Sequence, residues 1–562
     1  MNLKEQIRHS IPAAIVVVIG AWVMIYYSIV QWETMKPVPS WDLAIFSELA
    51  KAYAHFQTPI VPVKGDGYNL LGDHFHPILI LLGPIWRLFP TPLSLLITQD
   101  LLLAFSAWPL TRLASRLTNQ WVAGGLGLVY VLSWGMQGAV AAQFHEIAFA
   151  MPLLAYASVA FVERRWGAVA AWSAPLVLVK EDMGLTVLMI GVAVILTSLV
   201  PAWYRTCTVI RPGGHGADDP DDAAEAAEAA EADAARNRRR GLRLGVGMIV
   251  GGIATFLFSI LVFLPAFNIN GVWDYGLSSQ DKPTSPDALA QKVKVVVMLI
   301  LTSGIVGVTS PWLLVVLPTL AWRFLGSVEF YWVWDNWHYN VTLMPIALGA
   351  LLDVVARRRA HGSYVADRPV REVGVDGREV MDSSAETSED ESTADESDVD
   401  VLHRHPTAFP TWLTVPMRHR FVVATSILTA VVTGVLTGPY LPLWKATDQN
   451  FDPLSAEAKE TDEAKKPETR RVATAREVIA TIPEGATVVT DLSLLAYLVP
   501  RAEVSWSGTS GPDKEYIVMS RNSNNQWGTT DAATWGERHT TRGATYSLIF
   551  NKDGYQIAKR DD

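Results

Sequence analysis

The sequence predicts an all-α polytopic membrane protein that ends in a small extracytoplasmic α/β domain. Half of the 562 residues are hydrophobic and only 18% are charged, and the mean hydropathy of +0.20 is unusual for a soluble chain of this length. Apolar runs of about 20 residues, the length that crosses the hydrocarbon core of a bilayer, recur along the chain. The single cysteine, Cys207, excludes an intramolecular disulfide and any cysteine-based metal cluster.

Residues 11–30 form the first expected membrane span. No small-residue cleavage site follows them, so we interpret the segment as a retained helix and not as a removed signal peptide. About eleven spans are expected in total, from the apolar runs alone. They are residues 11–30, 93–111, 121–138, 147–162, 167–179, 184–203, 244–265, 294–309, 311–324, 341–356 and 420–444.

Lysine and arginine residues near the helix ends predict the orientation, because they are retained on the cytoplasmic side. The basic residues of the N-terminus, the 112–119 turn, the 163–166 turn, Arg238–Arg240 and Arg357–Arg359 all fall on alternate loops. We therefore expect a multi-pass protein of the cell membrane with a cytoplasmic N-terminus and an extracytoplasmic C-terminal domain.

Residues 77–90 are apolar but short and interrupted by proline. Counting them as a span would place the later arginine clusters outside, so we expect this segment to lie along the outer interface. Trp86 and Arg87 would then be at the level of the lipid headgroups.

This layout divides the chain into membrane segments, two cytoplasmic loops and one soluble domain. Residues 382–400, inside the second cytoplasmic loop, are acidic and serine-rich, which is typical of a solvated disordered segment. The expected divisions are an N-terminal membrane half at 1–204 with a first external loop at 31–92, a charged cytoplasmic loop at 205–243, membrane helices at 244–356, an acidic cytoplasmic loop at 357–418, a last transmembrane helix at 419–444, a linker at 445–470 and the extracytoplasmic domain at 471–562.

The C-terminal domain shows short alternating helix and strand patterns. We expect a helix at 473–482, a strand at 486–490, a short helix at 493–499, a strand at 516–520 and a hairpin formed by 545–550 and 555–559. The domain contains no phosphate loop and no nucleophile elbow, so an accessory or acceptor-docking role is the modest interpretation.

Five polar stretches fall between apolar helices, all on the predicted external side. Polar groups at the mouth of a helical bundle cost free energy, so such groups are functional candidates. The stretches are Trp41-Asp42, Asp73-His74-Phe75-His76-Pro77, His145-Glu146, Lys180-Glu181-Asp182, and the run Tyr331–Tyr339, which contains Trp334, Asp335 and His338.

Asp42 has two alternative roles on local chemistry. It would either cap an amphipathic helix at 43–56 lying on the outer leaflet, which stabilises a helix start by about 1 kcal/mol, or take a proton from an acceptor hydroxyl at the membrane surface. The topology favours the second role.

The histidine-containing stretches leave three alternatives open. Asp73, His74 and His76 could bind a divalent metal, completed by His145 and Glu146 or by His338. They could equally hold a phosphate through N–H donors, or simply bond to the backbone. No spacing matches a known metal motif, so no cofactor is certain.

The other two stretches also allow a structural and a functional interpretation. Lys180, Glu181 and Asp182 would form either an internally paired charge cluster or a contact to a lipid phosphate. Trp334 and its aromatic neighbours would form either an interfacial belt or a surface that stacks on a sugar ring.

These motifs resemble the DUF2079 family of bacterial membrane proteins. The resemblance rests on Trp41–Phe46, Asn69–Pro77, His145–Phe149, Lys180–Asp182, His338-Tyr339 and Ile482–Ala486. The family has no settled activity to carry over.

A more distant similarity is to the GT-C membrane glycosyltransferases. The shared features are a cytoplasmic N-terminus, a long first external loop with an early acidic residue, an interfacial helix and an external C-terminal domain. In those enzymes an acidic residue of the first external loop acts as base, and only Asp42 matches it by position. This sequence has no Asp-X-Asp pair in that loop and no acceptor-peptide motif.

We therefore expect a glycosyltransferase that moves a sugar from a polyprenyl-phosphate donor to an extracytoplasmic glycan or lipid acceptor, with Asp42 as general base. Membrane lipid is an expected partner and nucleic acid is not. One alternative is a transporter or lipid flippase, favoured by Gln99 and Asp100 inside a predicted span. The other is a non-catalytic scaffold that binds the cell envelope.

Overall fold

The computed structural model of the chain describes residues 3–35, 40–199, 220–275, 286–326, 328–366, 415–443, 466–509, 513–521 and 530–561. Most of these residues are helical. Five helices are long and apolar enough to cross a membrane, which supports the predicted polytopic membrane character. They cover Leu3–Glu33, Pro92–Leu117, Glu231–Phe267, His338–Arg359 and Arg420–Tyr440.

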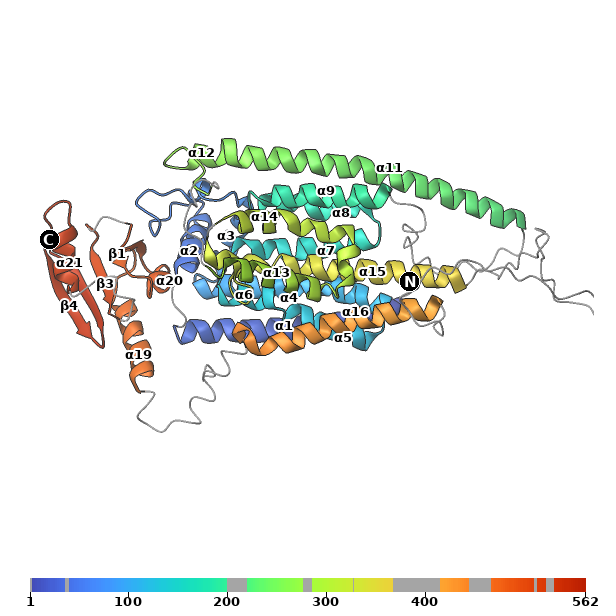
Figure 1. Cartoon of the computed structure of the whole chain (residues 1–562). Coiled ribbons are helices and arrows are strands. Elements are labelled where there is room, and N and C mark those ends of the chain that lie inside the picture. The colour runs from blue at the N-terminus through green and yellow to red at the C-terminus, as the bar shows by residue number, and fades with distance from the viewer. Residues whose placement is uncertain are drawn as a thin grey trace, which may run out of the picture.

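Shorter helices complete the bundle, and five apolar ones have 10–17 residues each. The bundle helices are α1 (Leu3–Glu33), α4 (Pro92–Leu117), α5 (Gln120–Val131), α6 (Trp134–Ala141), α7 (Ala150–Val162), α8 (Trp166–Ser173), α9 (Met183–Leu199), α11 (Pro220–Phe258), α12 (Leu264–Phe267), α13 (Ala288–Thr302), α14 (Leu317–Leu325), α15 (Leu343–Ala366) and α16 (Val415–Thr437). Two further helices, α2 (Trp41–Ala54) and α3 (Leu82–Leu88), lie at one end of the bundle (Figure 1).

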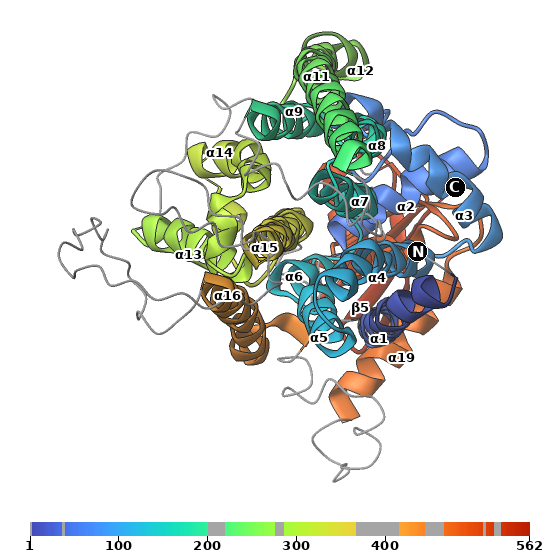
Figure 2. The same cartoon turned by 90° about the vertical axis from the view of Figure 1, so that its right-hand side faces the viewer.

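Helix α15 forms the centre of the bundle, with α4, α7, α13 and α16 packed around it (Figure 2). The apolar 18-residue stretch of the span that includes α15 is 89% buried, whereas the corresponding stretches of the spans that include α11 and α16 are only 17% buried. An apolar helix that exposes most of its side chains is suited to face lipid. The burial therefore separates a central helix from peripheral ones.

Helix α11 corrects one predicted boundary. The sequence predicts a charged loop at 205–243 followed by a span from 244, but α11 runs without interruption from Pro220 to Phe258. Alanine, glutamate and arginine are strong helix formers, so the charged run continues the apolar helix beyond the bundle (Figure 1). Cys207 and residues 382–400 lie outside the described residues.

Two other predicted spans are interrupted. The span predicted at 121–138 breaks between α5 and α6, where Leu132 ends one helix and Ser133 begins the next. After α13, Gly304 and Ile305 both adopt positive φ angles, of 65° and 63°. A positive φ ends a helix, which explains the interruption of the span predicted at 294–309.

Arginine residues from separate loops gather at the end of the bundle that we call the basic end. Arg116 and Arg165 both pair with Glu163. Arg164 pairs with the fully buried Asp353 at 2.8 Å, and Arg357 contacts the same carboxylate at 3.2 Å. The turns predicted to share one side of the membrane therefore do lie together.

The C-terminal domain lies at the opposite end, which we call the domain end (Figure 1). Its five-stranded sheet has the order β2-β1-β3-β5-β4, with β1 parallel to β2 and β3 and the last two pairings antiparallel. All the predicted elements are present, while β2 and α21 were not predicted. The elements are α19 (Lys466–Thr481), β1 (Thr487–Thr490), α20 (Leu495–Leu498), β2 (Glu503–Trp506), β3 (Tyr516–Ser520), α21 (Ala532–His539), β4 (Tyr546–Lys552) and β5 (Tyr555–Arg560).

Helix α2 lies between the bundle and this domain. The Ser40 hydroxyl donates to the Leu492 carbonyl at 3.0 Å and accepts from the Ala496 N–H at 3.1 Å. The Lys51 ammonium donates to the carbonyls of Val499 and Ala502, at 2.7 and 3.0 Å. These bonds join α2 firmly to the C-terminal domain.

The structure corrects the predicted setting of this helix. Nearly all residues from Leu43 to Ala54 are buried by protein, so α2 is not a helix on the surface of a leaflet. Its N-cap is Ser40, and Asp42 lies inside the first turn. The capping role considered for Asp42 is therefore wrong. Trp86, expected among headgroups, is also buried, at 2% exposure.

Candidate functional site

A pocket of about 960 Å³ opens at the domain end of the bundle. All five polar stretches contribute to its wall, together with α2, the 268–275 loop and the C-terminal domain. The predicted site residues that line it are Asp42, Asp73, His74, His76, His145, Glu146, Lys180, Glu181, Asp182 and His338. Trp334 and Asp335 are the two predicted residues that do not line it.

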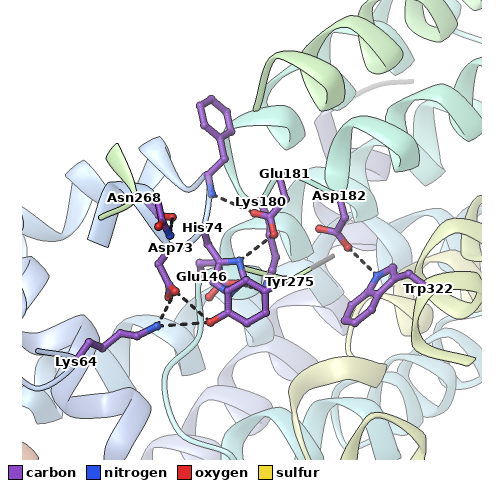
Figure 3. Close-up of polar contacts among 12 residues, drawn as sticks. Lys64, Asp73, His74, Glu146, Lys180, Glu181, Asp182, Asn268, Tyr275 and Trp322 are labelled. Carbon is purple, nitrogen blue, oxygen red and sulfur yellow. Dashed lines mark hydrogen bonds and ion pairs between the residues drawn. The ribbon is translucent and has the colours of Figure 1, made fainter. Parts of the chain in front are cut away.

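Asp73 is the centre of a polar cluster on one wall (Figure 3). Its Oδ1 accepts from Lys64 Nζ at 2.6 Å, from the Tyr68 hydroxyl at 2.8 Å and from the Tyr275 hydroxyl at 3.1 Å. Burial would raise the pKa of Asp73, but the charges of His74 and Lys64 outweigh burial and lower it to about 2. Asp73 is thus a fixed anion that organises the wall.

Gly72 explains how the 268–275 loop reaches this cluster. A Cβ at Gly72 would lie 2.3 Å from the Asn268 nitrogen, so only glycine permits the close approach of the two backbones. The Asn268 side chain donates to the Gly72 carbonyl at 3.1 Å. This contact brings Tyr275 over Asp73 and stacks its ring on His74, with the ring centres 4.3 Å apart.

Glu181 holds the Asp73–Pro77 stretch in place. One carboxylate oxygen contacts His74 Nδ1 at 2.8 Å, and the other accepts from the Phe75 N–H at 3.0 Å. Burial opposes a charge on the imidazole, yet the Glu181 carboxylate raises the pKa of His74 above its usual value. Burial likewise opposes the charge of Glu181, and the charge of His74 outweighs it and lowers the pKa of Glu181. The two side chains form a buried ion pair.

Lys180 and Asp182 take partners outside their own stretch. Lys180 Nζ donates to Glu146 Oε1 at 2.7 Å, and Trp322 Nε1 donates to Asp182 Oδ2 at 3.2 Å (Figure 3). Burial raises the pKa of Asp182 to about 6. Burial opposes the charge of Lys180, but the Glu146 carboxylate outweighs it and raises the pKa of Lys180. The internal pairing considered for this stretch is therefore wrong.

Gln99 shapes the turn that carries His145. Its side-chain amide donates to the carbonyls of Ala139 and Gln143, at 3.2 and 3.0 Å, and its oxygen accepts from the His145 N–H at 3.0 Å. A buried amide with three well-placed partners fixes the backbone around it. Gln99, which counted in favour of a transporter, thus has a positioning role.

His145 connects Asp42 to the interior of the pocket. Its Nδ1 lies 3.2 Å from the Gln143 carbonyl, which only accepts, so this nitrogen carries a proton. Its Nε2 then faces Asp42 Oδ2 at 3.5 Å. The His145 ring stacks on His338, with the centres 3.6 Å apart. The Asp42 side chain is 41% exposed and therefore accessible from the pocket.

The buried guanidinium of Arg323 holds the aromatic loop Tyr331–Tyr339. It donates to the carbonyls of Tyr331 and Tyr339 and to the Asn340 side chain, at 2.6–3.0 Å. Within the loop, Trp337 adopts φ 65° and ψ 161°. This region of conformational space is nearly exclusive to glycine and costs on the order of 1–3 kcal/mol, and such strain is concentrated at functional sites.

Trp334 and Asp335 are displaced by the path of the same loop. The Trp334 ring packs against Trp134 of α6, with the centres 6.4 Å apart. Trp334 therefore belongs to the packing between the loop and the bundle, while Trp337, Phe330 and Tyr339 line the pocket in its place.

The metal alternative finds no geometric support in the part of the chain that the structure describes. No group of three or more His, Cys, Asp or Glu side chains there is arranged to hold a metal ion. His74, Asp73 and Glu146 are each engaged by an oppositely charged partner. Burial lowers the pKa of His76 to about 4, so this side chain is neutral.

Several lining residues were not anticipated from the sequence. Lys64, Tyr275, Trp322 and Trp506 come from loops, from α14 and from the C-terminal domain. None of them belongs to the five polar stretches. Only the tertiary contacts with Asp73, Asp182 and Trp41 reveal them.

The pocket has an excess of negative charge. Five carboxylates line it (Asp42, Asp73, Glu146, Glu181 and Asp182) against two lysines, Lys64 and Lys180, and the His74 imidazolium. Three of the carboxylates are neutralised by those cations. Asp42 is the exposed one that remains, so the site can accept a proton and can bind polar, uncharged groups along its aromatic walls.

A comparison with curated proteins gave no match. The profile of the family described as predicted membrane protein (DUF2079) matches residues 38–371, which contain all five polar stretches. Since the match extends over more than half of the chain, the protein belongs to the DUF2079 family of predicted membrane proteins.

Proposed function

We propose that this protein is a membrane glycosyltransferase of the GT-C type, which moves a sugar from a polyprenyl-phosphate donor to a glycan or lipid acceptor. In this proposal the chain has about eleven spans, counting the shorter apolar helices. The domain end is extracytoplasmic, because the arginines of the basic end would be retained in the cytoplasm.

The observation that carries the proposal is the position of Asp42. Its carboxylate is exposed in the first turn of α2 and lines the same pocket as Lys180 and the aromatic loop. The proposed chemistry requires an accessible general base in the pocket. Helix α2, which follows the first membrane span, supplies such a carboxylate. The GT-C similarity implies the same arrangement.

In the proposed reaction, the Asp42 carboxylate takes the proton of an acceptor hydroxyl. The acceptor oxygen then forms a bond to the anomeric carbon while the bond from that carbon to the donor phosphate breaks, which inverts the configuration. The leaving group is polyprenyl phosphate. The His145 ring, held through its Nδ1–H by the Gln143 carbonyl, lies with Nε2 3.5 Å from Asp42 Oδ2 and limits where that carboxylate can lie.

Lys180 is the proposed contact for the leaving phosphate. One N–H of its ammonium is used by Glu146, and an ammonium group has three. The remaining donors are available to a phosphate oxygen at the pocket wall. The ion pair with Glu146 also fixes the Lys180 side chain, so little reorganisation is needed when charge develops.

The test uses purified protein in nanodiscs, supplied with a panel of polyprenyl-phosphate sugars and an envelope extract as acceptor. Release of free polyprenyl phosphate is followed by mass spectrometry for the wild type, for Asp42→Asn and for Glu329→Gln. Glu329 is an exposed carboxylate of the neighbouring loop that does not line the pocket. Release by the wild type and by Glu329→Gln, lost in Asp42→Asn, is the expected result. No release from any donor would overturn the proposal.

A transporter or flippase is the second candidate, and Asp100 is the observation that favours it. This residue is fully buried inside α4, and an ionisable residue within a membrane helix often marks a transport pathway. Lipid scrambling in liposomes that is lost in Asp100→Asn and retained in Asp42→Asn would favour transport over transfer.

A further inference from the structure

The C-terminal domain forms part of the pocket itself. Leu492 and Trp506 line the cavity, and both lie at the carboxyl ends of parallel strands of the sheet. Leu492 comes two residues after the end of β1, and Trp506 is the last residue of β2. The carboxyl ends of parallel strands are where open α/β sheets bind their ligands. This edge of the sheet is turned towards Asp42.

The position of Trp506 is tightly constrained. Its ring meets the Trp41 ring edge to face, with the centres 4.9 Å apart. A Cβ at Gly508 would lie 2.5 Å from the Trp506 ring, so a side chain at this position would push the ring away. The Thr509 hydroxyl donates to the Val63 carbonyl at 3.0 Å and ties the turn to the first loop.

The docking of the domain is equally well defined. Beyond the bonds of Ser40 and Lys51, Lys514 pairs with Asp66 at 2.9 Å, and the Tyr497 ring stacks on Trp32 with the centres 4.2 Å apart. A wall that is held by bonds on several sides is preorganised for a ligand. The domain is therefore in a position to contribute a fixed binding surface.

The chemistry of this wall favours a neutral saccharide. Two indole rings, from Trp41 and Trp506, offer apolar surface to the C–H face of a sugar ring, and Asp42 directly follows Trp41 in the chain. The Asp42 carboxylate beside these rings disfavours an acidic acceptor at this wall, because like charges repel. An uncharged ring with hydroxyl groups satisfies both conditions.

We infer that the C-terminal domain is the acceptor half of the site, in which Trp506 holds a neutral saccharide acceptor with a hydroxyl beside Asp42. This inference rests on the proposed function, and it adds the class of the acceptor and the residue that binds it. Trp506 is a binding residue, and its removal should weaken the binding of the acceptor.

The test measures saccharide binding and donor cleavage separately, on the full chain in nanodiscs. Short oligosaccharides of glucose, mannose, galactose and N-acetylglucosamine are titrated by calorimetry into the wild type, Trp506→Ala, Trp506→Phe and Trp121→Ala. Trp121 is 91% exposed at the start of α5 and serves as the matched control. Release of polyprenyl phosphate to water, without acceptor, is measured on the same samples.

We expect one saccharide to bind the wild type and Trp121→Ala equally, and Trp506→Ala to bind it about tenfold or more weakly, a loss of about 1.4 kcal/mol. Trp506→Phe should recover part of the affinity, and Trp121→Ala should release polyprenyl phosphate at the wild-type rate. Gly508→Ala, which displaces the ring without removing it, should weaken binding in the same direction and guards against misfolding of Trp506→Ala.

Two results would overturn the inference: no oligosaccharide binds the wild type, or Trp506→Ala and Gly508→Ala both bind as tightly as the wild type. Saccharide binding that depends on Trp506 in a protein that releases no polyprenyl phosphate would have a different meaning. It would overturn the transferase and leave the saccharide surface, so the two failures are distinguishable.

Discussion

His74 and Glu181 lie 107 positions apart in the chain and are joined at 2.8 Å inside the pocket wall. The contact fastens the 73–77 stretch to the turn before α9. The Glu181 carboxylate also accepts from the Phe75 N–H. A change in the protonation of Glu181 therefore affects both the ion pair and the backbone at Phe75.

Replacing Glu181 with Gln should loosen this wall. The pKa of His74 is raised by Glu181, so in the wild type the stabilising pair is fully present below about pH 6.5 and is lost as the pH rises through the raised pKa. Glu181→Gln should lack that step and lower the turnover about tenfold, since bonds to charged groups contribute on the order of 1.5–3 kcal/mol. Thermal unfolding between about pH 5 and pH 9 measures the step. Glu163→Gln, at the basic end, is the control and should retain it.

Replacing Glu48 with Gln should stabilise the protein at alkaline pH. Glu48 is buried beside the C-terminal domain, where the Val63 N–H donates to it at 3.3 Å, and burial raises its pKa from 4.5 to about 8. The folded state holds a proton that the unfolded chain releases, so stability falls as the pH rises between these two values.

Glu48→Gln removes this loss, and its unfolding midpoint should match the wild type near pH 4.5 and exceed it at pH 8. At about 1.4 kcal/mol for each pKa unit between 4.5 and 8, the expected difference at pH 8 is several kcal/mol. The exposed Glu484 provides the control, as Glu484→Gln. A difference that does not grow with pH would contradict the prediction.

Replacing Trp337 with Gly should give a more stable protein than replacing it with Ala, which is the reverse of the usual order of stability. Because its φ of 65° and ψ of 161° suit only glycine, Trp337→Gly should be more stable than Trp337→Ala by about 1 kcal/mol. Turnover should fall equally in both variants, since both lack the indole that lines the pocket. Unfolding midpoints measured side by side check the order, and alanine above glycine would mean that the backbone at this position is relaxed.

Replacing Gln99 with Leu should reduce turnover without weakening donor binding. The substitution leaves two carbonyls and the His145 N–H without their partner, at about 1–3 kcal/mol for each unsatisfied group. His145 would then no longer be aligned with Asp42. Thr98→Val is the neighbouring control, because Thr98 bonds only within α4 at Ser94. Equal turnover in Gln99→Leu and the wild type would remove Gln99 from the positioning of His145.

Much of the architecture follows from local patterns. Apolar length and the distribution of arginine group the polar stretches at one end, and ten of the twelve predicted site residues do line one pocket. The short strands of the C-terminal domain follow from runs of β-branched and aromatic residues, as in β1 (TVVT) and β3 (YIVMS). These features depend on neighbours within a few positions, which a single sequence displays.

Other features depend on contacts that no local pattern encodes. Lys180 lies next to Glu181 and Asp182 in the chain but pairs with Glu146, because the fold brings this carboxylate from another turn to 2.7 Å from the Lys180 ammonium. Trp334 and Trp337 belong to one aromatic run, and only the anchoring by Arg323 decides which of them faces the pocket. The charged part of α11 has the composition of a solvated segment, yet it continues a membrane helix.

The contact between α2 and the C-terminal domain also determines when the pocket can be completed during synthesis. Ser40 and Ala496 are bonded across 456 positions of chain, so the two sides of the pocket leave the ribosome at very different times. At about 5–20 residues per second, the first side waits roughly 20 to 90 seconds for the second. Until then, the apolar side of α2 is without its cover and the pocket is open on one side. A nascent chain of this protein therefore lacks one wall of the pocket until its last domain has been made.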